Sequence, residues 1–492
     1  MLFNSYTFIF LYLPIVLSGY FWFARINHVF SAAWLALASL FFYGYWNPAY
    51  IGLLLGSIIC NYTFGLWIAK AGLKSATKGT QKSILIFSIT ANLLLLGYYK
   101  YVNFFISSIN SVAATNWSVG EIILPLGISF FTFTQIAFLV DTYQGKVKEY
   151  NFIHYTLFVT YFPHLLAGPV LHHREMMPQL QQQKNYQINW DNIANGTLLF
   201  TLGLCKKTLL ADSFAPYSNA IFRAAQHGLP LTIYEAWSGA LAYTMQIYFD
   251  FSGYTDMALG IALLFNIRLP INFDSPYKAK SIIDFWRRWH MTLSRYLRDY
   301  LYIPLGGNRK GKARRYLNLL LTMLLGGLWH GAGWTFVIWG VLHGVYLTIN
   351  HLWHEQVTTK LPFTFPVWLS ATVGGTITFV AVVAAWVMFR AYDLSSASLM
   401  LNAMFGIESR PITFFDVTHG KLLITSDMSG KSFVELLIPS LLWVWLLPNS
   451  SRIKLIKGNL LVVLIQAIVV FYFLCVAIDQ FGSYSPFLYF QF

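Results

Sequence analysis

The chain has 492 residues, of which 57% are hydrophobic, 18% are aromatic and only 11% are charged. Soluble domains carry about 25% charged residues, so this composition excludes an ordinary soluble globular protein. The net charge of +14 does not indicate a nucleic-acid binder, because the basic residues lie beside apolar stretches and form no polar module of their own.

Apolar stretches long enough to cross a bilayer as helices, about 17 to 25 residues, recur along the whole chain. They predict one all-α, polytopic membrane domain over residues 1–492, with about 11–13 membrane helices. The N-terminus lacks the basic start and cleavage site of a signal peptide, so we expect the first stretch to remain as a helix. The predicted spans are 6–23, 30–46, 49–69, 84–106, 122–144, 153–171, 193–211, 232–251, 254–268, 317–328 with 334–352, 366–390, 433–448 and 458–478.

The positions of lysine and arginine predict how the chain is oriented in the membrane, because basic residues near span ends are retained in the cytoplasm. Arg25 follows the first span and four lysines follow the third, so we expect the N-terminus outside. The weakly charged connection 107–121 is then also outside. The densest basic segment, 278–315, is expected on the cytoplasmic face. Its apolar residues from Ile282 to Leu301 recur at roughly helical spacing, which predicts an interfacial helix or one packed partly into the membrane body.

The remaining polar stretches, 172–192 and 392–432, are predicted to be loops with short surface helices. The three cysteines are odd in number and lie far apart in apolar contexts, which indicates neither a disulfide framework nor a metal site. No internal repeat is evident. This weakens a transporter interpretation without excluding it, since many transporters have paired halves.

His330 is the leading candidate for chemistry. The apolar stretch 317–325 is too short to cross the bilayer, and Gly326 and Gly327 permit either close packing or a break before Trp329-His330-Gly331. The imidazole would then lie within the membrane, facing a protein interior or a wet cavity. There it could act as a base, with an ordinary pKa of about 6.5, or simply bond to a neighbouring carbonyl.

Other polar residues leave two interpretations open. His290 lies on the apolar side of the predicted interfacial helix, where it either orients an acyl donor or satisfies a buried carbonyl. The turn 304–311 lacks the P-loop pattern, so it is either a basic anchor or a binder of coenzyme A or lipid phosphates. Of the two acids Asp250 and Asp256, one either pairs with a buried arginine or shapes a cavity wall. A zinc site on His172, His173 and Glu175 lacks a clear further ligand.

Several segments together resemble the membrane-bound O-acyltransferase (MBOAT) family, and more narrowly its bacterial alginate O-acetyltransferase, AlgI-like, branch. The most specific are 284–294, 298–308 and Trp329-His330-Gly331; 161–169, 250–254 and both chain ends support them. The resemblance covers nearly the whole chain. It implies a core region over 245–350, with peripheral N-terminal helices in 1–110 and C-terminal helices in 366–492.

The family resemblance implies an MBOAT fold around a central tunnel, in which acyl donor and acceptor meet from opposite sides. It implies that His330 and His290 are catalytic, with His330 as the general base, and that acetyl-coenzyme A is the donor substrate, with no bound cofactor and no metal. The oxyanion-stabilising groups stay unassigned. Further candidates for binding the donor or lining the tunnel are Asp284, Trp286, Arg287, Trp289, Arg298, Asp299, Asn308, Trp329, Asp250 and Ser252.

The same resemblance implies a bacterial inner membrane, surrounding membrane lipids, a polysaccharide acceptor and a separate extracytoplasmic SGNH-type acetyltransferase partner. Three alternatives remain open. The first is a D-alanyl transferase acting on teichoic acid, although 304–308 favours the acetylating branch. The second is an acyl-lipid enzyme of the same fold. The third, from another class, is a non-catalytic component of polysaccharide or lipid transport.

Overall fold

The computed structural model describes residues 1–73, 78–120, 122–358, 366–411, 430–482, 487 and 488. These residues form helices and connecting segments, with no strand among them, which confirms the all-α fold. The chain divides into two compact units. Unit 1 comprises Met1–Leu204, Tyr254–Ile271 and Lys454–Gln491, and unit 2 comprises Cys205–Gly253 and Asn272–Ile453. The expectation of one domain over residues 1–492 remains a prediction.

Membrane-crossing character is clearest in five helical segments, which are long and apolar enough to span a bilayer: Thr7–Ala24, Ala49–Gly72, Lys78–Ala113, Val367–Arg390 and Leu460–Asp479. Two shorter apolar helices, His28–Gly44 and Ser432–Leu446, accompany them. Many of their large apolar side chains are exposed, Leu460 for example by 74%. Such outward-facing surfaces suit lipid as the solvent. The chain is thus a multi-pass membrane protein, while the total of about 11–13 membrane helices stays a prediction.

Unit 1 is held together partly by buried amides. Asn61 of α3 and Asn92 of α4 exchange side-chain hydrogen bonds of 2.6 and 3.1 Å. Gln135 of α6 donates to Ser57 of α3 over 3.0 Å. These polar groups face the interior, where helices can satisfy each other's side chains. The unit contains α1 (Leu13–Ala24), α2 (His28–Gly44), α3 (Ala49–Leu73), α4 (Lys78–Leu96), α5 (Val102–Ala113), α6 (Ile128–Tyr143), α7 (Phe152–Thr160), α8 (Phe162–Leu165), α9 (His173–Leu180), nearly all of α10 (Trp190–Cys205) and α22 (Leu460–Asp479).

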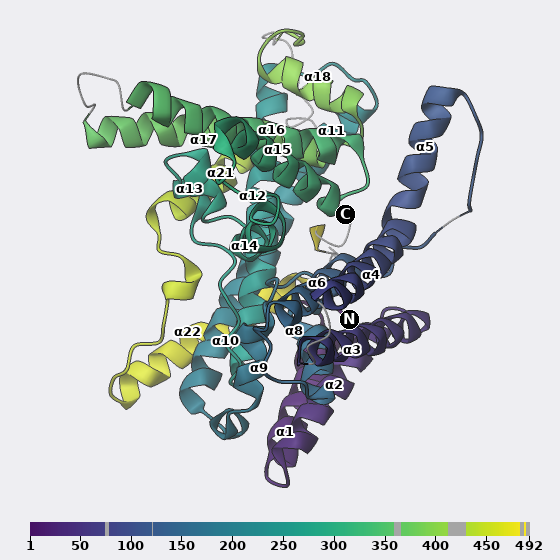
Figure 1. The fold of residues 1–492 in the computed structure, drawn as a ribbon. Coiled ribbons are helices and arrows are strands. Elements are labelled where there is room, and N and C mark those ends of the chain that lie inside the picture. Colours follow the sequence, from purple (N-terminus) through teal and green to yellow (C-terminus); the bar gives the residue numbers. More distant parts are fainter. Residues whose placement is uncertain (74–77, 121, 359–365, 412–429, 483–486, 489–492) are drawn as a thin grey trace. The chain divides into compact units, whose positions relative to one another are not determined.

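Unit 2 carries most of the polar residues predicted to do chemistry. Its helices are α11 (Asp212–Gln226), the first two thirds of α12 (Ile233–Leu264), α13 (Ile282–Trp286), α14 (Met291–Leu297), α15 (Gly311–His330), α16 (Trp334–Trp353), α17 (Val367–Arg390), α18 (Leu394–Met404) and α21 (Gly430–Leu446). Short π-helical segments lie at η4 (Lys206–Ala211), η6 (Arg298–Tyr302) and η7 (His354–Thr358). Helices α15 and α16 pack side by side as a hairpin (Figure 1).

Three of the expected spans differ in the structure. The spans expected at 232–251 and 254–268 form the single helix α12 of 32 residues, because Gly253 is tolerated inside a helix and the carboxylate of Asp250 is paired. The span expected at 153–171 instead forms α7, of 9 residues, and α8, of 4 residues. A helix of 9 residues is only about 14 Å long, too short to cross a bilayer. Pro163 and Gly168 lie where the chain departs from a single helix.

The basic segment does not form the single amphipathic helix that its spacing predicts. Helix α13 ends at Trp286, and His290 adopts the left-handed conformation with φ of 42° before α14 begins. The chain is held in this break by the segment that precedes it. Asp274 donates its N–H to the Arg288 carbonyl, and Met291 donates its N–H to the Asn272 carbonyl, at 3.0 and 2.9 Å. These tertiary hydrogen bonds replace bonds that a continuous helix would make.

Candidate active site

A close contact between α15 and α16 places His330 at the tip of their hairpin. An added Cβ on Gly327 would lie 2.3 Å from the Phe336 carbonyl oxygen, and one on Gly340 would lie 2.4 Å from that of Met323. Only glycine therefore permits the two backbones to approach this closely, as in small-residue contacts of membrane helices. Of the two roles predicted for Gly326 and Gly327, close packing is the one observed, and α15 continues unbroken to His330.

His330 lies inside an aromatic pocket. Its side chain is buried, with the residue 7% exposed. The ring centroids of Trp329, Trp339 and Phe389 lie 5.0, 5.2 and 5.2 Å from that of His330. The His290 ring lies 6.2 Å away. As the last residue of a 20-residue helix, His330 is located where the helix dipole favours a positive charge.

His290 has a defined tautomer. The Asn272 side-chain oxygen accepts from the backbone N–H of Thr292 over 3.2 Å and from its hydroxyl over 2.8 Å. The same oxygen lies 3.1 Å from Nδ1 of His290. Because this oxygen accepts, Nδ1 must carry the proton, which leaves Nε2 as the acceptor nitrogen. His290 lies between α13 and α14. Burial lowers the pKa of His290 to about 3, so the ring is neutral at physiological pH.

A third histidine, His343 of α16, has the opposite tautomer. The indole N–H of Trp286 donates to its Nδ1 over 3.2 Å, and an indole nitrogen can only donate. The proton of the neutral ring is therefore on Nε2. This nitrogen is buried and has no hydrogen-bond partner within the described residues, and the same holds for the indole nitrogen of Trp339. The two rings lie 4.8 Å apart, so two buried N–H donors are in one aromatic cluster.

The predicted candidates outside α12 separate into an aromatic group and a polar group. Trp286, Trp289 and Trp329 join the histidines; Trp289 lies 4.9 Å from Trp386, which in turn stacks on Trp339 at 5.8 Å. The polar candidates bond elsewhere. Asp284 accepts from Arg288, Arg298 pairs with Asp299, Asn308 accepts from the Tyr302 hydroxyl, and Arg287 is exposed.

Two candidates on α12 are buried. The Asp250 carboxylate lies 2.8 Å from the Lys207 ammonium, with side chains 2% and 1% exposed, and Lys207 also lies 2.7 Å from Asp212. The basic partner of Asp250 is thus a lysine, whereas the sequence interpretation considered a buried arginine as one of two alternatives. Ser252 is buried as well. Phe251 lies between Asp250 and Ser252 in the sequence, and its ring centroid is 4.8 Å from that of His290. This contact brings this stretch of α12 to the site.

Sequence reasoning missed Trp339, His343, Trp386 and Phe389 as members of the cluster. Trp339 and His343 are four residues apart on one helix, a spacing that places both on the same face. That pattern nine residues after His330 was an available signal. Trp386 and Phe389 lie in an almost entirely apolar helix, where nothing local distinguishes them from lipid-facing residues. Among the described residues, no three His, Cys, Asp or Glu side chains gather in a way that could hold a metal ion.

Comparison with known proteins identifies the family of this chain. The sequence matches the membrane-bound O-acyltransferase family, MBOAT, over residues 16–392. It is 42% identical to the peptidoglycan O-acetyltransferase of Helicobacter pylori, over 92% of this chain and 90% of that protein. It is 37% identical to the probable alginate O-acetylase AlgI of Pseudomonas putida, over 100% of both chains. The teichoic acid D-alanyltransferase of Streptococcus thermophilus is 28% identical over 48% of this chain and 58% of that protein. With the family match spanning most of its length, the chain belongs to the membrane-bound O-acyltransferase family and is an acyltransferase.

Proposed function

We propose that this chain transfers an acetyl group from cytoplasmic acetyl-coenzyme A for the O-acetylation of an extracytoplasmic glycan. The observation that carries the proposal is the location of His330. It lies buried at the tip of the α15–α16 hairpin, with the His290 ring centroid 6.2 Å away. Relatives named as a peptidoglycan O-acetyltransferase and a probable alginate O-acetylase align along nearly all of this chain, which supports acetyl as the group transferred.

In the proposed mechanism His330 is the general base. It takes the proton from the acceptor hydroxyl, whose oxygen attacks the thioester carbonyl carbon. The tetrahedral intermediate then collapses, the C–S bond breaks, and the departing thiolate receives the proton from the imidazolium. The products are the acetyl ester and coenzyme A. The carboxyl end of α15 stabilises the imidazolium while it carries the proton.

The other two histidines have complementary roles in this proposal. The neutral His290 presents Nε2 as an acceptor, and Asn272 holds its ring in place. His343 and Trp339 supply buried N–H donors. We assign these donors to the oxyanion of the tetrahedral intermediate, because donors held in a water-poor site stabilise developing negative charge without reorganising.

The final acceptor of the acetyl group is proposed to be a polysaccharide outside the inner membrane. The relative at 42% identity is named for peptidoglycan and the full-length relative for alginate, so both glycans are candidate acceptors. A separate SGNH-type acetyltransferase is proposed to complete the transfer, with the N-terminus of this chain on the extracytoplasmic side. D-alanylation of teichoic acid is the second candidate, supported by the 28% identical relative over about half of this chain.

Transfer of radiolabelled acetyl from acetyl-coenzyme A by the purified protein, with its partner and candidate glycans, tests the proposal. We expect His330→Ala to reduce transfer by at least 100-fold, since a general base contributes about 10²–10⁴-fold. His227→Ala, at an exposed histidine after α11, is the matched control and should retain wild-type activity. Equal transfer by His330→Ala would refute the base assignment. Transfer from a D-alanyl carrier protein in place of acetyl-coenzyme A would favour the second candidate.

A further inference from the structure

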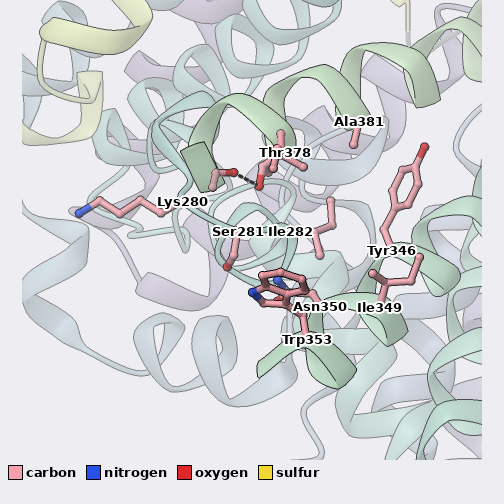
Figure 2. A pocket seen from close by; sticks show the side chains of 11 residues that line it. Lys280, Ser281, Ile282, Tyr346, Ile349, Asn350, Trp353, Thr378 and Ala381 are labelled. Carbon is pink, nitrogen blue, oxygen red and sulfur yellow. Dashed lines mark hydrogen bonds between the residues drawn. The ribbon is translucent and has the colours of Figure 1, made fainter. Parts of the chain in front are cut away.

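Unit 2 contains a cavity of about 300 Å³ outside the histidine cluster. The start of α13 with the two residues before it, the second half of α16 and the middle of α17 form it (Figure 2). Its volume is at the lower end of the range for ligand sites, about 300–1,000 Å³. The lining consists of Lys280, Ser281, Ile282, Tyr346, Ile349, Asn350, Trp353, Gly374, Ile377, Thr378 and Ala381.

The inner surface of this cavity suits an apolar ligand. The Thr378 hydroxyl donates within its own helix to the Gly374 carbonyl over 2.7 Å. The Ser281 hydroxyl caps α13 by accepting from the N–H of Asp284 over 3.1 Å. Both hydroxyls are therefore already engaged, and the surface left to a ligand is mostly hydrocarbon. An added Cβ on Gly374 would lie 2.5 Å from the Lys280 carbonyl oxygen, so backbone contact closes one side.

The mouth of the cavity faces surroundings that suit lipid. Ile349, Trp353 and Ile377 are 57%, 59% and 64% exposed. Side chains of this size are exposed at such levels where hydrocarbon chains surround the protein. The cavity is thus reached from an apolar outer surface, which favours a ligand that is itself dissolved in the membrane.

A positive charge marks the edge of the same cavity. Lys280 is exposed, and its side chain extends away from the other lining side chains (Figure 2). Within the described residues, no hydrogen bond or ion pair engages its ammonium group. Asn350 of α16 also lines the cavity and adds an amide to it. A lysine above an apolar crevice on the predicted cytoplasmic side is the arrangement that attracts anionic lipid headgroups.

We propose that this cavity binds one acyl chain of an anionic phospholipid, with the lipid phosphate at the Lys280 ammonium. The chain packs against Ile282 and Tyr346. Ile282 begins the helix that carries Trp286, and the Tyr346 ring lies 5.7 Å from that of His343. Bound lipid therefore supports the two elements whose hydrogen bond fixes the His343 tautomer. The proposal does not depend on which acyl group the enzyme transfers.

Lipid binding to the purified, delipidated full chain tests this assignment by native mass spectrometry. Phosphatidylglycerol is compared with phosphatidylcholine that has the same acyl chains. We expect phosphatidylglycerol to bind the wild type at least fivefold more tightly, and Lys280→Gln to remove this preference. Lys82→Gln, which removes an exposed charge that does not line the cavity, should leave the preference unchanged. Equal binding of both lipids by the wild type would overturn the charge assignment.

Filling the cavity provides a second, separate test. Ala381→Phe occupies the interior, and Ile349→Trp narrows the mouth from an exposed position with little risk to folding. Both should weaken phosphatidylglycerol binding at least fivefold, whereas Val373→Phe, at an exposed α17 position outside the lining, should not. Unchanged binding by folded Ile349→Trp would overturn the location. Displacement of the lipid by acetyl-coenzyme A would overturn the choice of ligand. If a variant loses acetyl transfer but still binds phosphatidylglycerol like the wild type, the result bears on the proposed function and not on this site.

Discussion

Two of the three clustered histidines differ in what their nitrogens can do, and a single neighbour decides this in each. Asn272 makes Nε2 of His290 an acceptor, whereas Trp286 makes Nε2 of His343 a donor. A buried donor without an acceptor costs about 1–3 kcal/mol. Such a cost at His343 is consistent with a group that bonds to a reacting oxygen, because unsatisfied polar groups in folded proteins concentrate at functional sites.

His343→Phe should lower kcat by about 10²-fold, the loss typical of removing one oxyanion donor, with little change in KM. Phenylalanine keeps a buried ring but loses Nε2–H. Trp286→Phe is the matched control: it removes the hydrogen bond to Nδ1 but leaves the imidazole in place, so we expect its loss of kcat to be smaller, at most about 10-fold. Steady-state kinetics of both variants decide the point. If His343→Phe keeps kcat within threefold of wild type, His343 is not an oxyanion donor.

At the scale of elements, the α15–α16 hairpin locates the site through glycine contacts. Gly327 and Gly340 lie where backbone atoms of the facing helix leave no space for a Cβ. The interface therefore determines how far His330 lies from Trp339, which is on the opposite helix. Helix α13 contributes through Trp286, and α17 contributes through Trp386 and Phe389. No single helix of unit 2 contains the site.

Gly340→Ala should separate α15 from α16 and destabilise unit 2 by about 1–3 kcal/mol, the usual cost of overpacking. Thermal unfolding of the detergent-solubilised protein measures this as a lowered Tm. Gly52→Ala, on α3, is the control, since no heavy atom lies within 4 Å of its added Cβ. Alanine there should keep or raise stability, because alanine favours helix over glycine by about 1 kcal/mol. Equal Tm values for the two variants would exclude a close-packing role for Gly340.

At the scale of the whole molecule, the membrane-spanning helices differ in how much of their surface is buried within the protein. Only 6% of the residues in the apolar stretch of Leu460–Asp479 are buried, whereas 44% of those in Val367–Arg390 are buried. Helix α22 therefore faces mainly lipid, and α17 divides its surface between lipid and the aromatic cluster. The uneven placement of lysine and arginine predicts the direction in which this assembly crosses the membrane.

The predicted orientation can be tested by cysteine labelling in intact cells. In a chain whose native cysteines, Cys60, Cys205 and Cys475, are replaced by alanine, Ser118→Cys should react with a membrane-impermeant maleimide. Lys310→Cys should react only after the inner membrane is opened. Both positions are exposed, so accessibility from the two sides is the only difference. The reverse labelling pattern would invert the topology and place the donor on the wrong side for cytoplasmic acetyl-coenzyme A.

The amino-acid sequence by itself determined the membrane character, the helical class, the family resemblance and the prominence of His330 and His290. These depend on composition, span length and local motifs, which need no tertiary contact. Only the tertiary structure decided that residues 282–302 break at His290, because Asn272 and Asp274 of the preceding segment bond to the break. It also decided that α12 is continuous, with Lys207 paired to Asp250. The cluster of Trp339, His343, Trp386 and Phe389 came from packing as well, since apolar periodicity cannot tell a ring facing lipid from one facing a histidine.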